Sequence, residues 1–197
     1  IAAVHAVTSG AATYVLVNQT VHQPTGRYHA FDEPVASGTH QWTAPYGCIA
    51  PVNAIAMTYM EYQQRFGARR EHMATLALQL RENAQVVPET YWNGQSLTFA
   101  DYMTCRMISE PMCLYDNDIP VDASVSFIIT SAERAADLRH PAVFVTAWAE
   151  TKGSRPVPPG TFGPLDYHYE AGFDIQQRLW QRSGWRPDDI DVPQLYD

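Results

Sequence analysis

Three short runs of apolar and β-branched residues constrain the fold of this chain most strongly. They occupy residues 13–19 (T-Y-V-L-V-N-Q), 125–130 (V-S-F-I-I-T) and 142–150 (A-V-F-V-T-A-W-A-E). Such runs lack the regular alternation of a half-exposed strand and are typical of strands covered on both faces, as in parallel sheets. We therefore expect a sheet that lies buried between layers of other structure.

Segments with helical spacing separate these runs. Pro51 suits the first turn of a helix that Gly67 would end, and Thr98 with Asp101 forms a variant of the capping box. Strands that alternate with helices favour an α/β fold with a mostly parallel sheet and helices on its faces. The helical stretch 51–110 would be an insertion on that sheet. The expected helices cover residues 1–9, 51–66, 69–84, 98–107, 131–138 and 169–183.

Both ends of the sequence resemble the interior of a longer protein. Residues 1–7 (I-A-A-V-H-A-V) have a helical pattern without an N-cap, so their first amide donors need partners from earlier sequence. Residues 190–196 have the pattern of a buried strand, which stops at Asp197. We expect the interior of a longer polypeptide, or a subunit that a partner completes.

Composition narrows the classes of function. Apolar residues make up 46% of the chain and aromatic residues 12%, which is enough for a packed core. The formal charge of −8 argues against nucleic-acid binding, because such binding depends on Lys and Arg neutralising phosphates. An anionic small ligand held by a local group of arginines stays compatible with this charge. No apolar run approaches the roughly 20 residues of a membrane span, so we expect none.

The cysteines indicate neither disulfides nor a metal site. Cys48, Cys105 and Cys113 are odd in number and form no C-x-x-C pair, which predicts buried, reduced thiols in a cytoplasmic protein. No His lies beside them in a triad-like context, so a nucleophilic role is not expected. The seven His are scattered and supply no zinc-ligand spacing, so we expect no metal.

Three segments, taken in order, resemble the thiolase superfamily, specifically its lipid-transfer-protein-like branch that acts on branched or steroidal acyl-CoA. Residues 46–74, beginning Y-G-C-I-A-P-V-N, resemble the helix pair of that family's loop domain. Residues 109–135, including V-S-F-I-I-T-S-A-E-R-A, resemble the return from the loop domain into the sheet. Residues 185–197 (W-R-P-D-D-I-D-V-P-Q-L-Y-D) resemble the strand that leads to the active-site motif.

This resemblance implies part of a five-layer α-β-α-β-α fold built from two similar halves, usually dimeric. Residues 1–19 and 121–138 would belong to the N-terminal half, and 141–197 would begin the C-terminal half. Residues 20–120 would form the loop domain that shapes the acyl-CoA site. The family's nucleophilic Cys and its Gly-His-Pro motif would lie beyond the two ends.

Two departures from the family pattern bear on activity. Ala123 replaces a Gly at the entry to a strand, which puts in doubt a turn that requires positive φ there. Tyr196 stands where thiolases carry Asn and the sterol-carrier branch His. Those residues hold a water of the oxyanion hole, whereas a Tyr can donate a hydrogen bond or a proton to a developing enolate or alkoxide. By its residue type alone, Tyr196 could equally be a packed strand-end Tyr with its hydroxyl in water.

Five further residues are candidates for substrate binding, and each could instead have a purely structural role. Tyr46 and Trp42 would line the acyl pocket, or would be core aromatics beside a helix start. Arg69 and Arg70 open a helix against its macrodipole, which suggests a CoA phosphate or an inter-subunit carboxylate as partner, or only a solvated face. Asp118 could orient substrate, or residues 116–118 could simply form a turn.

The Tyr196 substitution resembles the thiolase-like aldolases of steroid side-chain degradation. It implies retro-aldol cleavage of a 3-hydroxyacyl-CoA with a steroid or branched side chain, with CoA as part of the substrate and no separate cofactor. The alternatives are a 3-ketoacyl-CoA thiolase or acyltransferase, and a non-catalytic subunit that binds acyl lipid or acts as a scaffold. The resemblance also implies a homodimer and a partner protein with an OB-fold and a zinc ribbon.

Overall fold

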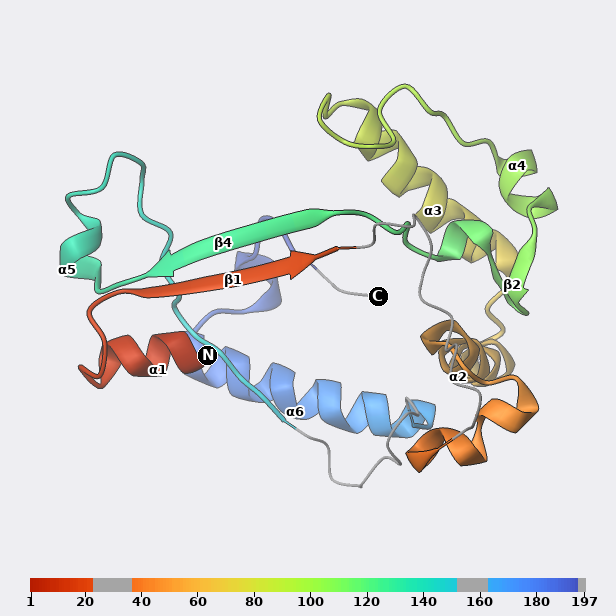
Figure 1. Ribbon diagram of the computed structural model, residues 1–197, viewed down its shortest axis with the longest axis horizontal. Coiled ribbons are helices and arrows are strands. Elements are labelled where there is room, and N and C mark those ends of the chain that lie inside the picture. Colours follow the sequence, from red (N-terminus) through yellow and green to blue (C-terminus); the bar gives the residue numbers. More distant parts are fainter. Residues whose placement is uncertain (23–36, 152–162, 195–197) are drawn as a thin grey trace. The chain divides into compact units, whose positions relative to one another are not determined.

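The computed structural model describes residues 1–22, 37–151 and 163–194 (Figure 1). The chain divides into two compact units. Unit 1 comprises Ile1–Arg27, Pro120–Ser154 and Tyr169–Asp197, and unit 2 comprises Tyr28–Ile119 and Arg155–His168. The architecture is mixed α/β. The assignment of these segments to halves of a thiolase fold stays a prediction.

A two-stranded antiparallel ribbon forms the centre of unit 1. Strand β1 (Val15–Val21) pairs with β4 (Ala123–Ile129), with Val15 opposite Ile129 and Val21 opposite Ala123. Ala123 therefore begins a strand, and no residue other than Gly has positive φ in the described part of the chain. The helix α1 (Ala2–Thr8) packs against both strands, and the chain turns from α1 into β1 at Gly10 with φ of 76° (Figure 1).

The expected parallel sheet is wrong for the strands that the structure describes. The second pair, β2 (Met107–Ser109) with β3 (Met112–Cys113), is also antiparallel. An apolar run predicts burial on both faces of a strand but carries no information on strand direction. The direction depends on which other strand pairs with it in the fold. Residues 142–150 and 190–194 form no strand, because a strand requires a hydrogen-bonded neighbour and they pair with none of the described strands.

The helices of unit 2 follow the sequence signals closely. Helix α2 (Pro51–Phe66) has the predicted bounds, and Gly67 ends it in the left-handed conformation with φ of 66°. Helix α3 (Arg70–Gln85) begins and ends one residue later than predicted. In α4 (Phe99–Thr104) the Thr98 hydroxyl accepts the Asp101 amide as the capping box predicts, but the helix ends early because the chain turns into β2. The 3-10 turns are η1 (Gly38–Trp42), η2 (Ala44–Tyr46), η3 (Leu114–Asp116) and η4 (Pro187–Asp189).

Two helices of the later sequence differ from expectation in length. Helix α5 (Ala132–Ala135) is capped by Ser131 as predicted but is shorter than 131–138. Helix α6 (Leu165–Ser183) begins earlier than 169 because the Leu165 amide donates to the Glu61 carboxylate of α2 at 3.0 Å. Asp166 in the same first turn pairs with Arg65. This cap lies about a hundred residues away in sequence and leaves no local signal.

The core of unit 2 lies where α3, α4 and β3 meet. Ala74, Tyr102 and Cys113 are fully enclosed there. All three cysteines are free, but only Cys113 is buried, so the expectation of buried thiols is wrong for Cys48 and Cys105, which are half-buried. Partly buried side chains surround the centre: Met73, Ala77, Leu78, Met103, Cys105 and Tyr115.

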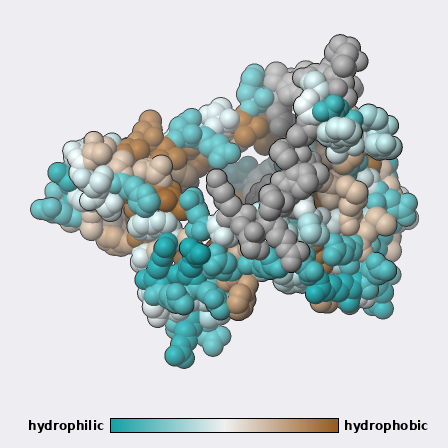
Figure 2. Space-filling model, turned by 90° about the horizontal axis from the view of Figure 1, so that it is seen from below, coloured by the Kyte–Doolittle hydropathy of each residue, from teal (hydrophilic) through white to brown (hydrophobic). Residues whose placement is uncertain are grey.

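Unit 1 leaves many apolar side chains exposed. Leu16, Phe127 and Ile128 of the ribbon are exposed, as is Val143 of the following segment. In Figure 2 brown apolar atoms gather in the left half of the view, where the ribbon and α1 lie. No helix among residues 1–22, 37–151 and 163–194 is both long and apolar enough to cross a bilayer.

Candidate active site

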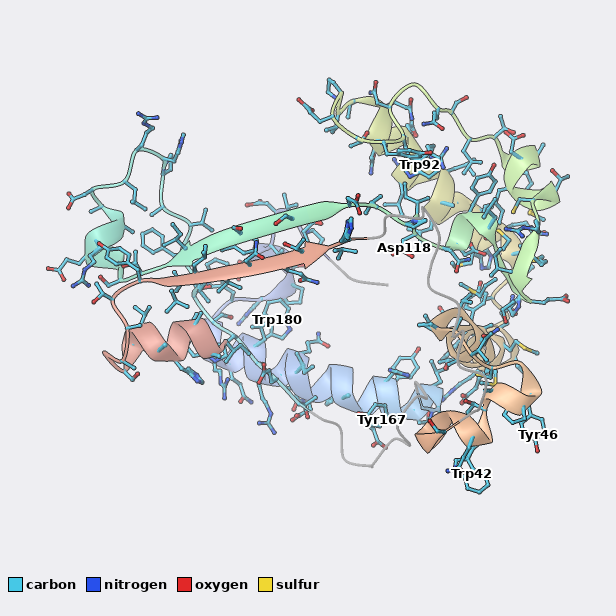
Figure 3. All side chains as sticks on the ribbon, in the orientation of Figure 1. Trp42, Tyr46, Trp92, Asp118, Tyr167 and Trp180 are labelled. Atoms are coloured by element: carbon cyan, nitrogen blue, oxygen red, sulfur yellow. The ribbon has the colours of Figure 1, made fainter. Side chains whose placement is uncertain are left out.

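Trp42 and Tyr46 lie on consecutive 3-10 turns just before α2. Thr43 precedes η2, and Gly47 turns the chain away from it with φ of 81°. The side chains project outward (Figure 3), and the residues are 73% and 87% exposed, respectively. They are therefore not core aromatics in this structure. Their exposed rings offer apolar area to a ligand, and their role in an acyl pocket stays a prediction.

Arg69 is the N-cap residue of α3 and is largely exposed. Its Nε lies 3.8 Å from a carboxylate oxygen of Glu71, and its side chain is 72% exposed. A pair this long and this solvated contributes little to stability. The Arg69 guanidinium is thus accessible to an anionic group such as a phosphate.

Arg70 has a structural role that the sequence did not reveal. Its Nη1 donates to the Met103 carbonyl at 2.9 Å, and its Nη2 donates to the Tyr102 carbonyl at 2.8 Å. A cation is unfavourable at the start of its own helix, but here it satisfies carbonyls at the C-terminal end of α4, where a positive charge is favourable. Two of its donor groups are therefore occupied inside unit 2, and a phosphate would have to compete for them.

The acidic turn at residues 116–118 contains one half-buried carboxylate, Asp116, and one exposed carboxylate, Asp118. Asp116 accepts the Tyr102 hydroxyl at 2.5 Å and the Cys113 amide at 2.6 Å, and Asn117 donates to the Cys113 carbonyl at 2.7 Å. The turn interpretation is confirmed for Asp116 and Asn117, because both bond the backbone of their own turn. Asp118 is exposed just after η3 (Figure 3), and its predicted role in orienting substrate stays open.

Two tyrosines and a cysteine around Asp116 are held protonated. Burial, followed by the hydrogen bond to Asp116, raises the pKa of Tyr102 above its ordinary value. Burial and the nearby Asp116 charge also raise the pKa of Tyr59, whose hydroxyl is enclosed. Burial is the largest cause that raises the pKa of the Cys113 thiol to about 11. At neutral pH these groups can donate hydrogen bonds but cannot act as bases.

Tyr196, the predicted catalytic residue, lies outside the described residues. The chain that leads toward it follows α6 through η4, and Ile190 is half-buried there. Its acid/base role stays a prediction.

Unit 1 also contains a cavity of about 520 Å³ that sequence reasoning missed. The His5 and Trp148 rings meet edge-on with centroids 5.5 Å apart, and Arg182 donates to the Trp148 carbonyl at 2.7 Å. No residue with a predicted site role contributes to it. Its lining consists of Ile1, His5, Thr146, Ala147, Trp148, Glu150 and Arg182.

No group of three or more His, Cys, Asp or Glu side chains in the described ranges could hold a metal ion. The sequence-predicted residues that can be placed, Trp42, Tyr46, Arg69, Arg70 and Asp118, all belong to unit 2. They occupy three separate stretches of it: the turns before α2, the start of α3 and the segment after η3.

No protein-family model matches the chain. It is 27% identical over 211 residues to a steroid side-chain-cleaving aldolase of Thermomonospora curvata, an alignment that covers 98% of this chain and 51% of that protein. It is 28% identical over 165 residues to a 17-hydroxy-3-oxo-4-pregnene-20-carboxyl-CoA lyase of Mycobacterium tuberculosis, covering 80% of this chain and 41% of that one. The chain thus spans about half the length of the curated relatives it matches.

A solved structure, an Ltp2-ChsH2(DUF35) aldolase, shares this architecture. It superposes with a TM-score of 0.79 at 27% identity, covering 94% of this chain and 48% of that one. The chain is therefore similar in sequence and in fold to part of enzymes named as aldolases and lyases. These names agree with the resemblance to steroid side-chain aldolases that the three sequence segments indicate.

Proposed function

We propose that this chain forms part of an enzyme that cleaves a C–C bond in a steroid acyl-CoA by retro-aldol chemistry on a thiolase-like fold. The observation that carries the proposal is similarity over 98% of the chain to a protein named for steroid side-chain cleavage. A second relative is named a lyase of a hydroxylated steroid carboxyl-CoA, which is the substrate class a retro-aldol reaction requires.

The chemistry needs a 3-hydroxyacyl-CoA. A base removes the hydroxyl proton, and the bond between the hydroxyl-bearing carbon and the α-carbon breaks. Its electron pair passes to the α-carbon as a thioester enolate, which then takes a proton. The products are a ketone and a shorter acyl-CoA, so no cysteine nucleophile is needed. Tyr196 is proposed as the proton carrier or the oxyanion donor in this sequence.

Residues of unit 2 are proposed to bind the two ends of the substrate. Trp42 and Tyr46 present exposed rings of the kind that pack against a steroid or acyl group. Arg69 is accessible, and a guanidinium matches the geometry of a CoA phosphate. Arg70 would contribute less, because its donors hold the end of α4. Asp118 is proposed to orient the substrate by hydrogen bonding.

We also propose that the enzyme works as a dimer and with a second protein, of the kind that carries an OB-fold and a zinc ribbon. The name of the similar solved structure joins two components, Ltp2 and ChsH2(DUF35), which supports a partner for this chain. Copurification of such a protein with the native polypeptide would test this part independently of activity.

The test of function is an assay of the native polypeptide with 17-hydroxy-3-oxo-4-pregnene-20-carboxyl-CoA, the substrate named for one relative. Mass spectrometry should detect a ketone and a shorter acyl-CoA. We expect Tyr196→Phe to lower kcat about a hundredfold or more, while substrate binding changes little. Tyr91→Phe is the matched control, because Tyr91 is exposed and lies outside the proposed site.

Three outcomes would contradict parts of this proposal. A loss of fivefold or less with Tyr196→Phe would remove Tyr196 from catalysis. Cleavage that requires a 3-ketoacyl-CoA and added free CoA would identify a thiolase. Substrate binding without any turnover, in the presence of the copurified partner, would identify a non-catalytic binding subunit.

A further inference from the structure

Two of the three cysteines lie against each other in unit 2. Cys113 ends β3 and is fully enclosed, whereas Cys105 is the C-cap residue of α4 and is half-buried. Cys105 packs against the enclosed cluster that contains Cys113, and its thiol is one cause of the raised pKa of Cys113. The proposed carbon–carbon cleavage uses neither thiol.

The local backbone explains why the thiols meet. Met107 lies opposite Cys113 in the β2–β3 pair, and the Leu114 amide donates to the Arg106 carbonyl at 2.9 Å. Cys105 comes two residues before Met107 and has extended dihedrals, φ of −68° and ψ of 160°. Side chains two residues apart in an extended segment lie on the same face, so Cys105 and Met107 share a face. Cys113 lies directly opposite Met107 and is therefore on that face as well.

The surroundings of the two sulfurs differ in a way that assigns an order of reaction. Arg70 interacts with both sulfurs, with its Nη2 3.8 Å from that of Cys105, but only Cys105 is partly accessible. Reactive cysteines are found in such electropositive, partly exposed places. Burial and the neighbouring Cys105 thiol instead raise the pKa of Cys113 to about 11, so Cys113 stays a thiol near neutral pH.

We propose that Cys105 and Cys113 form an oxidation site for hydrogen peroxide or a small organic hydroperoxide, which closes to a disulfide. The Cys105 sulfur attacks the peroxide, an S–O bond forms, the O–O bond breaks, and water or an alcohol leaves. The Cys113 sulfur then attacks the Cys105 sulfenic acid; an S–S bond forms, the S–O bond breaks, and water leaves. The peroxide is reduced by two electrons, and the two thiols supply them.

The bond would join the end of α4 to β3 within the core of unit 2. It would also remove the sulfhydryl that Arg70 contacts, while the guanidinium keeps its bonds to the carbonyls of Tyr102 and Met103. This inference does not rest on the proposed function, and its test uses chemical composition rather than turnover.

The experiment treats the native protein with hydrogen peroxide, blocks the remaining thiols under denaturing conditions, and maps the peptides by mass spectrometry. We expect a linked Cys105–Cys113 peptide, lighter by about 2 Da than the two reduced peptides, since two hydrogens are lost. Cys48 should be recovered as a blocked thiol, and Cys48→Ser should leave the linkage unchanged.

Two variants test the assigned order. Cys113→Ser should stop the reaction at a Cys105 sulfenic acid, which dimedone would trap. Cys105→Ser should leave Cys113 reduced at peroxide doses that fully convert the wild-type protein.

The proposal is overturned if Cys105 and Cys113 are both recovered as free thiols at a dose that oxidises free glutathione. Preferential oxidation of Cys48, or a sulfenic acid on Cys113 in the Cys105→Ser variant, would overturn it as well. Circular dichroism checks that the variants fold, and the wild-type peptide map decides the question even if one of them does not.

Discussion

The two compact units of this chain differ in how far they bury their apolar side chains. In the described residues, every buried apolar side chain belongs to unit 2: Ala54, Ala56, Ala74, Tyr102, Met112, Cys113 and Leu165. Unit 1 has the stronger apolar runs, yet Ile128 is 69% exposed and Val143 is 96% exposed. Unit 2 therefore buries its apolar side chains within these residues. The strands of unit 1 have sequences suited to a covered sheet but stay mostly exposed, although α1 packs against them.

This difference has an energetic meaning. Burial of apolar area stabilises by roughly 25 cal/mol per Å², and an isolated two-stranded ribbon is at best marginally stable in water. The ribbon in unit 1 adds a ladder of side-chain hydrogen bonds, in which Asn18 donates to Ser126 at 2.8 Å and to Ser124 at 3.1 Å. Such exposed bonds contribute modestly, so most of the stability within this chain is expected in unit 2.

The largest effect that would test this comparison comes from Tyr102→Ala. Tyr102 is 1% exposed, and its hydroxyl donates to Asp116, so truncation leaves both a cavity and an unpaired acceptor. We expect a loss of about 3–5 kcal/mol in the free energy of unfolding, measured by urea denaturation. Tyr91→Ala, at an exposed position of the same unit, should cost far less. Equal losses would mean that unit 2 lacks the core described above.

A smaller effect is expected from a pair of neighbouring arginines. Arg70→Met removes the donors to the Tyr102 and Met103 carbonyls and should cost about 1.5–3 kcal/mol, because hydrogen bonds to charged groups are the stronger ones. Arg69→Met removes only a long, exposed ion pair and should change stability by less than about 1 kcal/mol. The same urea titration checks both variants. The reverse order would show that Arg70 does not hold the end of α4.

The smallest effect is expected in unit 1. Ile128→Thr changes an exposed residue of β4 and keeps the β-branched shape, so the free energy of unfolding should stay within about 0.5 kcal/mol. Ala74→Thr, at a fully enclosed position of unit 2, serves as the contrasting variant. A large loss with Ile128→Thr in the native protein would show that this face is covered there, and would break the comparison.

The part of the fold that the sequence predicted well consists of elements with local signals. Pro51 and Gly67 fix the bounds of α2 because a missing amide suits a first turn and a positive φ suits a helix end. Thr98 and Ser131 cap the helices that follow them, as expected. In each case the decisive atoms lie within about four residues of one another, so the pattern is visible in the sequence.

Elements that depend on distant partners were missed or misjudged. The start of α6 is set by Glu61, and the function of Arg70 is set by carbonyls more than thirty residues later in the chain. The antiparallel direction of β1 and β4 depends on which two strands pair in the fold, and an apolar run does not encode that pairing. The contact between Cys105 and Cys113 likewise depends on the turn from β2 to β3 rather than on their spacing.

The sequence alone determined the bounds of α2 and, to within one residue, those of α3. It also determined which segments are apolar enough for strands, and the resemblance to enzymes of acyl-CoA chemistry. Tertiary structure alone decided the strand direction, the enclosure of Tyr102 and its hydrogen bond to Asp116. It also decided that Arg69 is accessible while Arg70 is engaged, and that Trp42 and Tyr46 are exposed. The physical reason is the sequence separation over which each interaction acts. Dihedral preferences and caps act between near neighbours, whereas burial, strand pairing and the partners of a charged group depend on residues that only folding brings together.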